Sequence, residues 1–153
     1  MLDGAIKDQQ TATADGKLTR TLLEGVTQKE VSNIITSNGA TTEIYRPEWP
    51  VGPDQIRHMI HAILRANAIS AWHIHEYQTD TIFVTQVSIK LVLFDDRPNS
   101  STRGQVNVFH LSRMRPILTT IPPGIWHGLH NIDNAESSFI NYFDRPYVYS
   151  DPD

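Results

Sequence analysis

Short apolar runs alternate with turn signals along most of this chain, as the printed sequence shows. Residues 81–85 and 88–94 are rich in Ile, Val and Phe, which is the composition of β-strands. Asn38-Gly39 is a strong hairpin signal between two further runs. Many short strands with hardly any helical periodicity predict an all-β barrel or jelly roll. The other expected strands are 31–36, 41–45, 105–111, 117–121 and 137–143.

Residues 55–64 fit two periodicities. Ile60, Ile63 and Leu64 have helical spacing, but Ile56, Ile60 and Leu64 also occupy one side of an alternating pattern. The surrounding strand pattern favours a strand here. The first 25 residues are polar, and we expect a flexible or swapped N-terminal arm at 1–25, followed by one β-barrel domain at 26–153.

Charge and composition exclude several classes of protein. The 153-residue chain has a formal net charge of -4, so it lacks the basic surplus expected of a nucleic-acid-binding protein. No apolar run reaches membrane-spanning length, and the N-terminus does not have the layout of a secretory signal. We therefore expect a cytoplasmic protein. Because there is no cysteine, any metal would be held by histidines and carboxylates.

Three histidines and one acid form the main chemical constellation. His73 and His75 are two residues apart, so on a strand both side chains would point to the same face. Asp80 follows, and Pro123-Gly124 predicts a tight turn that presents His127 on a later strand. Burying several imidazoles costs desolvation, so this grouping indicates a functional site.

The same residues allow two kinds of chemistry. His73, His75 and His127 could transfer protons, or His73, His75, Asp80 and His127 could hold Fe, Mn, Ni or Zn. Trp72 and Trp126 each precede a site histidine, and they would either pack in the core or stack against a ligand.

Several stretches between residues 42 and 147 resemble the dTDP-4-dehydrorhamnose 3,5-epimerase family of the cupin superfamily. The resemblance implies a cupin-type jelly-roll barrel, a homodimer and catalysis without a metal. It also implies enolisation beside the keto group of a nucleotide-linked sugar, which needs a base and a group that stabilises the enolate. The stretches that carry it are Thr42-Glu43-Ile44-Tyr45-Arg46-Pro47, Trp72-His73-Ile74-His75, Gln78-Thr79-Asp80, Asp96-Arg97-Pro98-Asn99-Ser100-Ser101-Thr102-Arg103-Gly104, Leu111-Ser112, Ile121-Pro122-Pro123-Gly124-Ile125-Trp126-His127-Gly128 and Asp144-Arg145-Pro146-Tyr147.

By this resemblance the catalytic histidine of the family falls on His73, and its acid tyrosine falls on Asn141. The family's arginines that hold the diphosphate, and the lysine that polarises the keto oxygen, have no equivalents here; Ser70-Ala71 and Asn38-Gly39 stand where Arg-Gly pairs are expected. His73-Ile74-His75 is also similar to the His-x-His pair of sugar 3,4-ketoisomerases.

The sequence therefore predicts a carbohydrate epimerase or isomerase that needs no cofactor and acts on a small sugar-type substrate. We expect His73 to be the general base, His75 the second acid/base and His127 the polarising group. Trp72, Gln78, Trp126 and Asn141 are the expected substrate-binding residues. A metal-dependent cupin enzyme and a catalytically silent sugar-binding cupin remain the alternatives.

Overall fold

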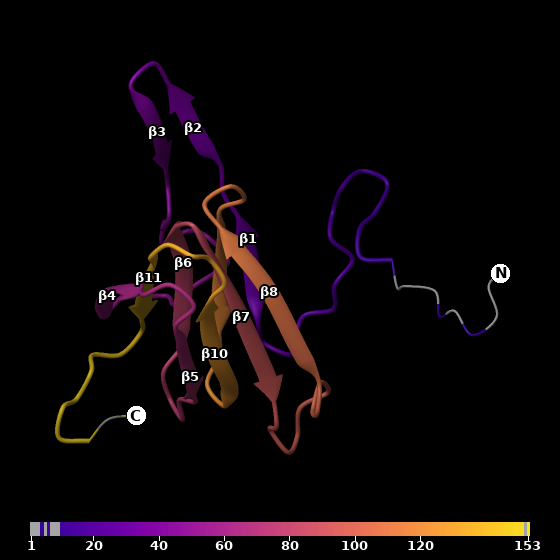
Figure 1. Cartoon of the computed structure of the whole chain (residues 1–153). Coiled ribbons are helices and arrows are strands. Elements are labelled where there is room, and N and C mark those ends of the chain that lie inside the picture. The colour runs from indigo at the N-terminus through magenta and orange to yellow at the C-terminus, as the bar shows by residue number, and fades with distance from the viewer. Residues whose placement is uncertain (1–3, 5, 7–9, 152) are drawn as a thin grey trace.

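The computed structural model describes Gly4, Ile6, residues 10–151 and Asp153. Two antiparallel sheets pack face to face, and the described residues contain no helix (Figure 1). The all-β class predicted from the sequence is confirmed. The strands are β1 Thr27–Glu30, β2 Asn33–Thr36, β3 Gly39–Thr42, β4 His58–Leu64, β5 Ile69–His73, β6 Asp80–Gln86, β7 Ser88–Asp95, β8 Val106–Ser112, β9 Ile117–Ile121, β10 Ile125–Asn131 and β11 Ser137–Phe143.

One sheet has the strand order β1-β9-β6-β11-β4, and the other has the order β5-β10-β7-β8. In β7 the buried positions alternate strictly with partly exposed ones, as expected for a strand with one face toward a core. Ile89, Leu91 and Leu93 of this strand are completely buried between the sheets. The ambiguous residues 55–64 contain the strand β4, which pairs with β11 along its whole length.

The five-stranded sheet is covered on its outer face as well. Phe83, Leu118 and Tyr142 form a second apolar cluster with Val51, which lies in the connection between β3 and β4. This explains why β6 is buried on both faces and shows no alternation in its burial. Tyr142 points away from the core between the sheets and donates its hydroxyl to the carbonyl oxygen of Ile44.

The hairpin predicted at Asn38-Gly39 is present, but its strands are shorter than expected and begin at Asn33 and Gly39. The β2–β3 hairpin projects away from the two main sheets (Figure 1). As a result, Ile34 and Ile35 are largely exposed. The sequence pattern gave no sign of β1, because its residues Thr27–Glu30 are polar.

The N-terminal segment is anchored before residue 26. Leu23 is buried in the core between the sheets, and its N–H donates to the side-chain oxygen of Asn107. Further upstream, Ala12 and Leu18 form an isolated bridge in a segment that extends from the body of the molecule (Figure 1). Residues 1–3, 5 and 7–9 of the predicted arm lie outside the described residues.

Gly128 of β10 lies close to Ala71 of β5. The register between these strands shifts between His127 and Leu129, and a Cβ atom on Gly128 would lie 2.7 Å from the Cβ of Ala71. We expect Gly128→Ala to lower the free energy of unfolding by about 1–3 kcal/mol, because the two methyl groups would overlap. Urea denaturation measures this change.

The matched control is the double variant Gly128→Ala with Ala71→Gly, which removes the opposing methyl group. Its free energy of unfolding should exceed that of Gly128→Ala and recover most of the loss expected for the single variant. Equal stability of the wild type and Gly128→Ala would show that the two strands do not need this contact.

Candidate functional site

Strand pairing brings two of the predicted histidines together. His127 of β10 is the register partner of His73, the last residue of β5. Paired residues present their side chains on the same face of a sheet, and the two ring centroids are 5.7 Å apart. His75 lies just beyond the end of β5, yet its ring centroid is 5.5 Å from that of His127. The three histidines therefore meet as predicted, although His73 and His75 do not share one strand.

Asp80 joins this cluster from the opposite sheet. It is the first residue of β6, and it is almost completely buried. Its Oδ2 lies 3.5 Å from Nε2 of His127, and its Oδ1 lies 3.7 Å from Nε2 of His75. The carboxylate therefore lies between two imidazoles, with one oxygen facing each.

Two buried amides hold Asp80 in place. Gln78 donates its Nε2 to Oδ1 of Asp80 at 2.7 Å, and Asn141 donates its Nδ2 to Oδ2 at 2.9 Å. Gln78 and Asn141 were predicted to bind substrate, but in the structure their amide groups orient this carboxylate. The Oδ1 atom of Asn141 is buried without a hydrogen-bond partner.

Hydrogen bonds at the other ring nitrogens define the histidine tautomers. Nδ1 of His127 lies 3.1 Å from the carbonyl oxygen of Ile125, and Nδ1 of His75 lies 3.2 Å from the main-chain oxygen of Asp153. A carbonyl oxygen only accepts, so we assign a proton to each Nδ1. Both Nε2 atoms then face the Asp80 carboxylate. A proton on each Nε2, or a metal ion bound by both Nε2 atoms and the carboxylate, would complete these contacts.

Asp80 carries the negative charge of this cluster. Burial by itself raises the pKa of Asp80, but the hydrogen bonds from His127 and Asn141 and the nearby imidazole charges outweigh burial. The pKa of Asp80 is therefore below its ordinary value.

His73 is in a different electrostatic situation. Partial burial lowers the pKa of His73, and the charges of His127 and His75 lower it further against the opposing effect of Asp80. Nε2 of His73 is 3.0 Å from the hydroxyl oxygen of Ser70. A neutral imidazole can accept a proton, so His73 is suited to act as a base at neutral pH.

The residues that could hold a metal differ from the predicted set. Ligand atoms of His75, Asp80 and His127 lie within 4.8 Å of one another, and His73 is not part of this group. Two imidazoles and a carboxylate suit Zn or Fe, and an Nδ1–H donated to a carbonyl oxygen is the usual support of a metal-bound histidine. These three residues therefore fit a divalent metal.

The predicted aromatic wall is not next to the histidines. Because side chains alternate along a strand, Trp72 and Trp126 point to the face opposite His73 and His127. They are 56% and 37% exposed on the outer face of the four-stranded sheet, so they do not flank the histidine cluster. Together they line an apolar hollow of about 500 Å³ with Val92, Phe94 and Val106.

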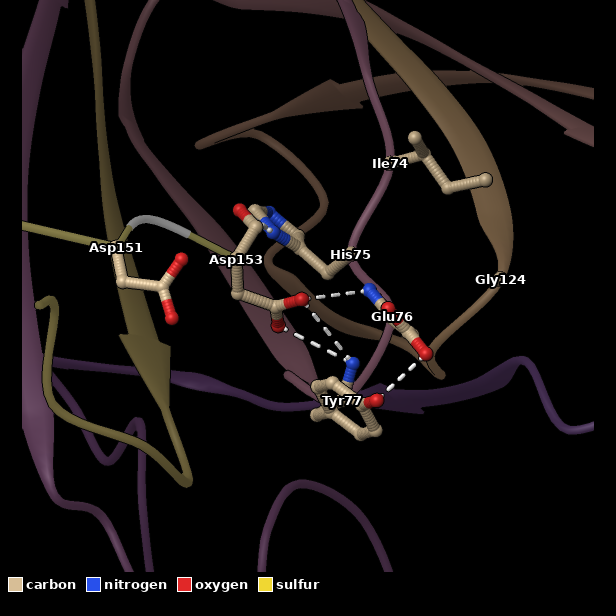
Figure 2. A pocket seen from close by; sticks show the side chains of 7 residues that line it. All are labelled: Ile74, His75, Glu76, Tyr77, Gly124, Asp151 and Asp153. Atoms are coloured by element: carbon tan, nitrogen blue, oxygen red, sulfur yellow. Dashed lines mark hydrogen bonds between the residues drawn. The ribbon is translucent and has the colours of Figure 1, made fainter.

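A cavity of about 660 Å³ opens beside His75, and Figure 2 shows the residues that line it. Asp153 lies between His75 and Tyr77, and its carboxylate faces the main chain of Glu76 and Tyr77. Tyr77 and Asp153 were not among the predicted site residues, because both lie outside the strands and belong to no chemical motif. The full lining is Ile74, His75, Glu76, Tyr77, Gly124, Asp151 and Asp153.

Comparisons with known proteins agree with this architecture. No protein-family profile matches the sequence. A probable low-salt glycan biosynthesis epimerase of Haloferax volcanii is 29% identical over 116 residues, which are 75% of this chain and 74% of the relative. A crystal structure of a dTDP sugar isomerase from Desulfovibrio desulfuricans G20 is 25% identical, with a TM-score of 0.80 over 88% of this chain and 87% of the other. The dTDP-4-dehydrorhamnose 3,5-epimerase of Elizabethkingia anophelis is 19% identical, with a TM-score of 0.73 over 88% of this chain and 76% of the other.

The two packed antiparallel sheets with a histidine cluster between them define a cupin-type jelly-roll protein. Among such proteins, the sequence and structural relatives are sugar epimerases and isomerases. The chain is thus similar in sequence to a probable glycan biosynthesis epimerase and in structure to dTDP-4-dehydrorhamnose 3,5-epimerases and a dTDP sugar isomerase.

Proposed function

We propose that this protein is a carbohydrate epimerase or isomerase that moves a proton at a carbon beside a keto group. The observation that carries the proposal is the convergence of His73, His75 and His127 on a scaffold shared with sugar epimerases. Enolisation needs a base that is neutral at working pH and a polarising group near the developing enolate. The cluster supplies one imidazole with a lowered pKa, that of His73, and two further imidazoles beside it.

In the proposed reaction, the imidazole of His73 removes the proton from the carbon next to the ketone. The electron pair of that C–H bond moves to form a C=C bond, and the carbonyl oxygen becomes an enolate oxygen. We assign His127, whose ring lies beside that of His73, as the polarising group for this oxygen. Return of a proton from His75 to the other face of the carbon gives the epimer, without net oxidation or reduction.

The substrate is a small carbohydrate. The relatives include a glycan biosynthesis epimerase and a dTDP sugar isomerase, which supports a keto-sugar, free or linked to a nucleotide. The proposed reaction needs no cofactor. We further propose a cytoplasmic homodimer, with a flexible or swapped arm before the barrel domain. No helix among the described residues is long and apolar enough to cross a membrane.

Solvent exchange tests this proposal directly. The protein is incubated in D2O with a panel of keto-sugars that includes a dTDP-4-keto-6-deoxy sugar, and mass spectrometry measures deuterium at carbons beside the ketone. Incorporation above the enzyme-free rate supports proton transfer. Absence of exchange across the panel would instead favour a silent sugar-binding protein.

The second candidate function is that of a metal-dependent cupin enzyme, which the convergence of His75, Asp80 and His127 favours. A metal bound there would act as a Lewis acid on a substrate oxygen. Under the leading proposal, protein grown in metal-replete medium should contain far less than one transition metal ion per chain by elemental analysis. A stoichiometric content that is lost in Asp80→Asn would support the metal enzyme and contradict the cofactor-free reaction.

A further inference from the structure

Three consecutive main-chain amides converge on one carboxylate beside His75. The N–H of Glu76 donates to Oδ1 of Asp153 at 2.8 Å, that of Tyr77 donates to Oδ2 at 3.1 Å, and that of Gln78 donates to Oδ2 at 2.9 Å. Figure 2 shows the carboxylate at this position, facing the main chain. Successive N–H groups that point into one concavity form an anion-binding nest. We call Glu76, Tyr77 and Gln78 the amide nest.

Asp153 contacts the catalytic cluster at a second point. Its main-chain oxygen accepts a hydrogen bond from Nδ1 of His75 at 3.2 Å. Asp153 thus places its side-chain carboxylate in the amide nest and a second oxygen, a few bonds away, on an imidazole of the proposed active site. A sugar acid has the same two features, a carboxylate and ring or hydroxyl oxygens a few bonds from it.

The nest stabilises the charged form of its occupant. Three N–H dipoles directed at one carboxylate favour an anionic occupant over a neutral one. The nearby carboxylate of Glu76 is engaged by the hydroxyl of Tyr77. On the other side, Arg145 donates its Nε to the carbonyl oxygen of Tyr77, and its guanidinium lies 5.6 Å from the centre of the Tyr77 ring. A cation therefore lies close to the nest.

Space for a larger occupant is present. The cavity of about 660 Å³ includes His75 and two members of the nest, and a hollow of about 300 Å³ lined by Arg145 and Gln78 adjoins it. Asp153 belongs to both linings, together with His75, Tyr77 and Asp151. Displacement of the Asp153 side chain would therefore widen the boundary that the two hollows share.

We propose that the amide nest is the substrate's anion subsite, which takes a carboxylate or phosphate of an acidic sugar, and that Asp153 is its intramolecular stand-in. The inference rests on the proposed function, because it places the anion next to His75 of the same site. The acidic group would anchor the sugar and bring its keto-bearing part toward the three histidines. Such an anchor compensates for the diphosphate-binding arginines that the sequence lacks.

The test compares wild-type protein with Asp153→Ala in titrations followed by the amide NMR signals of Glu76, Tyr77 and Gln78. The probes are glucuronate, inorganic phosphate and, as the neutral control, glucose. An occupant that fills the nest nine-tenths of the time weakens a competing ligand about tenfold, so we expect Asp153→Ala to bind at least one anion about tenfold more tightly than wild type. Glucose should move none of the three signals.

The two anion arms identify the source of the charge: tighter binding of glucuronate indicates a sugar acid, and tighter binding of phosphate indicates a sugar phosphate. Asp153→Asn serves as a second variant in case Asp153→Ala disturbs the loop, because it keeps the side-chain shape but loses the charge. It should also bind the anion more tightly than wild type. The proposal is overturned if neither variant binds either anion more tightly than wild type, or if the responding amides lie elsewhere. Deuterium exchange by wild-type protein is measured separately, so a failed anion subsite is distinguishable from a failed proton-transfer function.

Discussion

Replacement of His73 by asparagine should lower the rate of deuterium incorporation into a keto-sugar by about 10²–10⁴-fold, the range of a lost general base. The pKa of His73 is lowered chiefly by burial, so its ring is available as a base at neutral pH. Asparagine keeps a polar side chain near Ser70 but cannot take up the proton. Mass spectrometry of the sugar measures the effect.

The matched control is His110→Asn. His110 is an exposed residue of β8, on the edge of the same sheet, and its register partner is Lys90. It should exchange deuterium at the wild-type rate, and both variants should keep the wild-type melting temperature within a few degrees. A His73→Asn protein with undiminished exchange would exclude His73 as the base.

The largest expected effect on stability lies away from the histidines, at Asp95. This carboxylate is completely buried, and it accepts hydrogen bonds from the guanidinium of Arg97 at 2.9 and 2.8 Å. The hydroxyls of Ser100 and Thr102 donate to it as well. Arg97 in turn donates to the carbonyl oxygen of Glu24, which fastens the segment before β1 to the four-stranded sheet.

Asp95→Asn leaves the Arg97 charge partly buried without its partner, so we expect the free energy of unfolding to fall by about 3–5 kcal/mol. Urea denaturation at neutral pH measures this loss. The control is Asp96→Asn, because Asp96 is exposed and pairs with Arg103 at 3.6 Å. Its change should stay within about 0.5 kcal/mol. If the two variants lost similar amounts of unfolding free energy, the hydrogen bonds and ion pair of Asp95 would not be what stabilises this loop.

The same network predicts an acid dependence. Hydrogen bonds from Arg97 are the largest cause that lowers the pKa of Asp95 in the folded protein, and the hydroxyl donors lower it further. Because the unfolded state binds this proton at higher pH, the stabilisation is complete above the ordinary value of 3.8 and is lost as the pH falls further. The stability difference between wild type and Asp95→Asn should therefore shrink below about pH 4.

Much of the fold could be predicted from local patterns. Strand composition placed β6, β7, β9 and β11, and Asn38-Gly39 placed the protruding hairpin. The similarity to epimerases, inferred from short motifs, agrees with the relatives found. Polar strands such as β1 escaped prediction, because their partners supply the hydrogen bonds and their own residues carry no apolar signal.

Within the candidate site, the sequence by itself determined which chemical groups are available: three imidazoles, one nearby acid and no thiol. Strand alternation also makes neighbours such as Trp126 and His127 point to opposite faces once their strand is known. Only the tertiary structure decided which of them meet. It placed the two tryptophans on the outer face and turned Gln78 and Asn141 onto Asp80. Of the four predicted metal ligands, it kept His75, Asp80 and His127 together and left His73 out.

The physical reason is that local sequence fixes the direction of a side chain relative to its own strand, whereas a site depends on how separate strands and loops pack. The contact of His75 with Asp153, 78 residues further along the chain, exists only because the last described segment folds back over the loop at Glu76. No periodicity or motif encodes that contact.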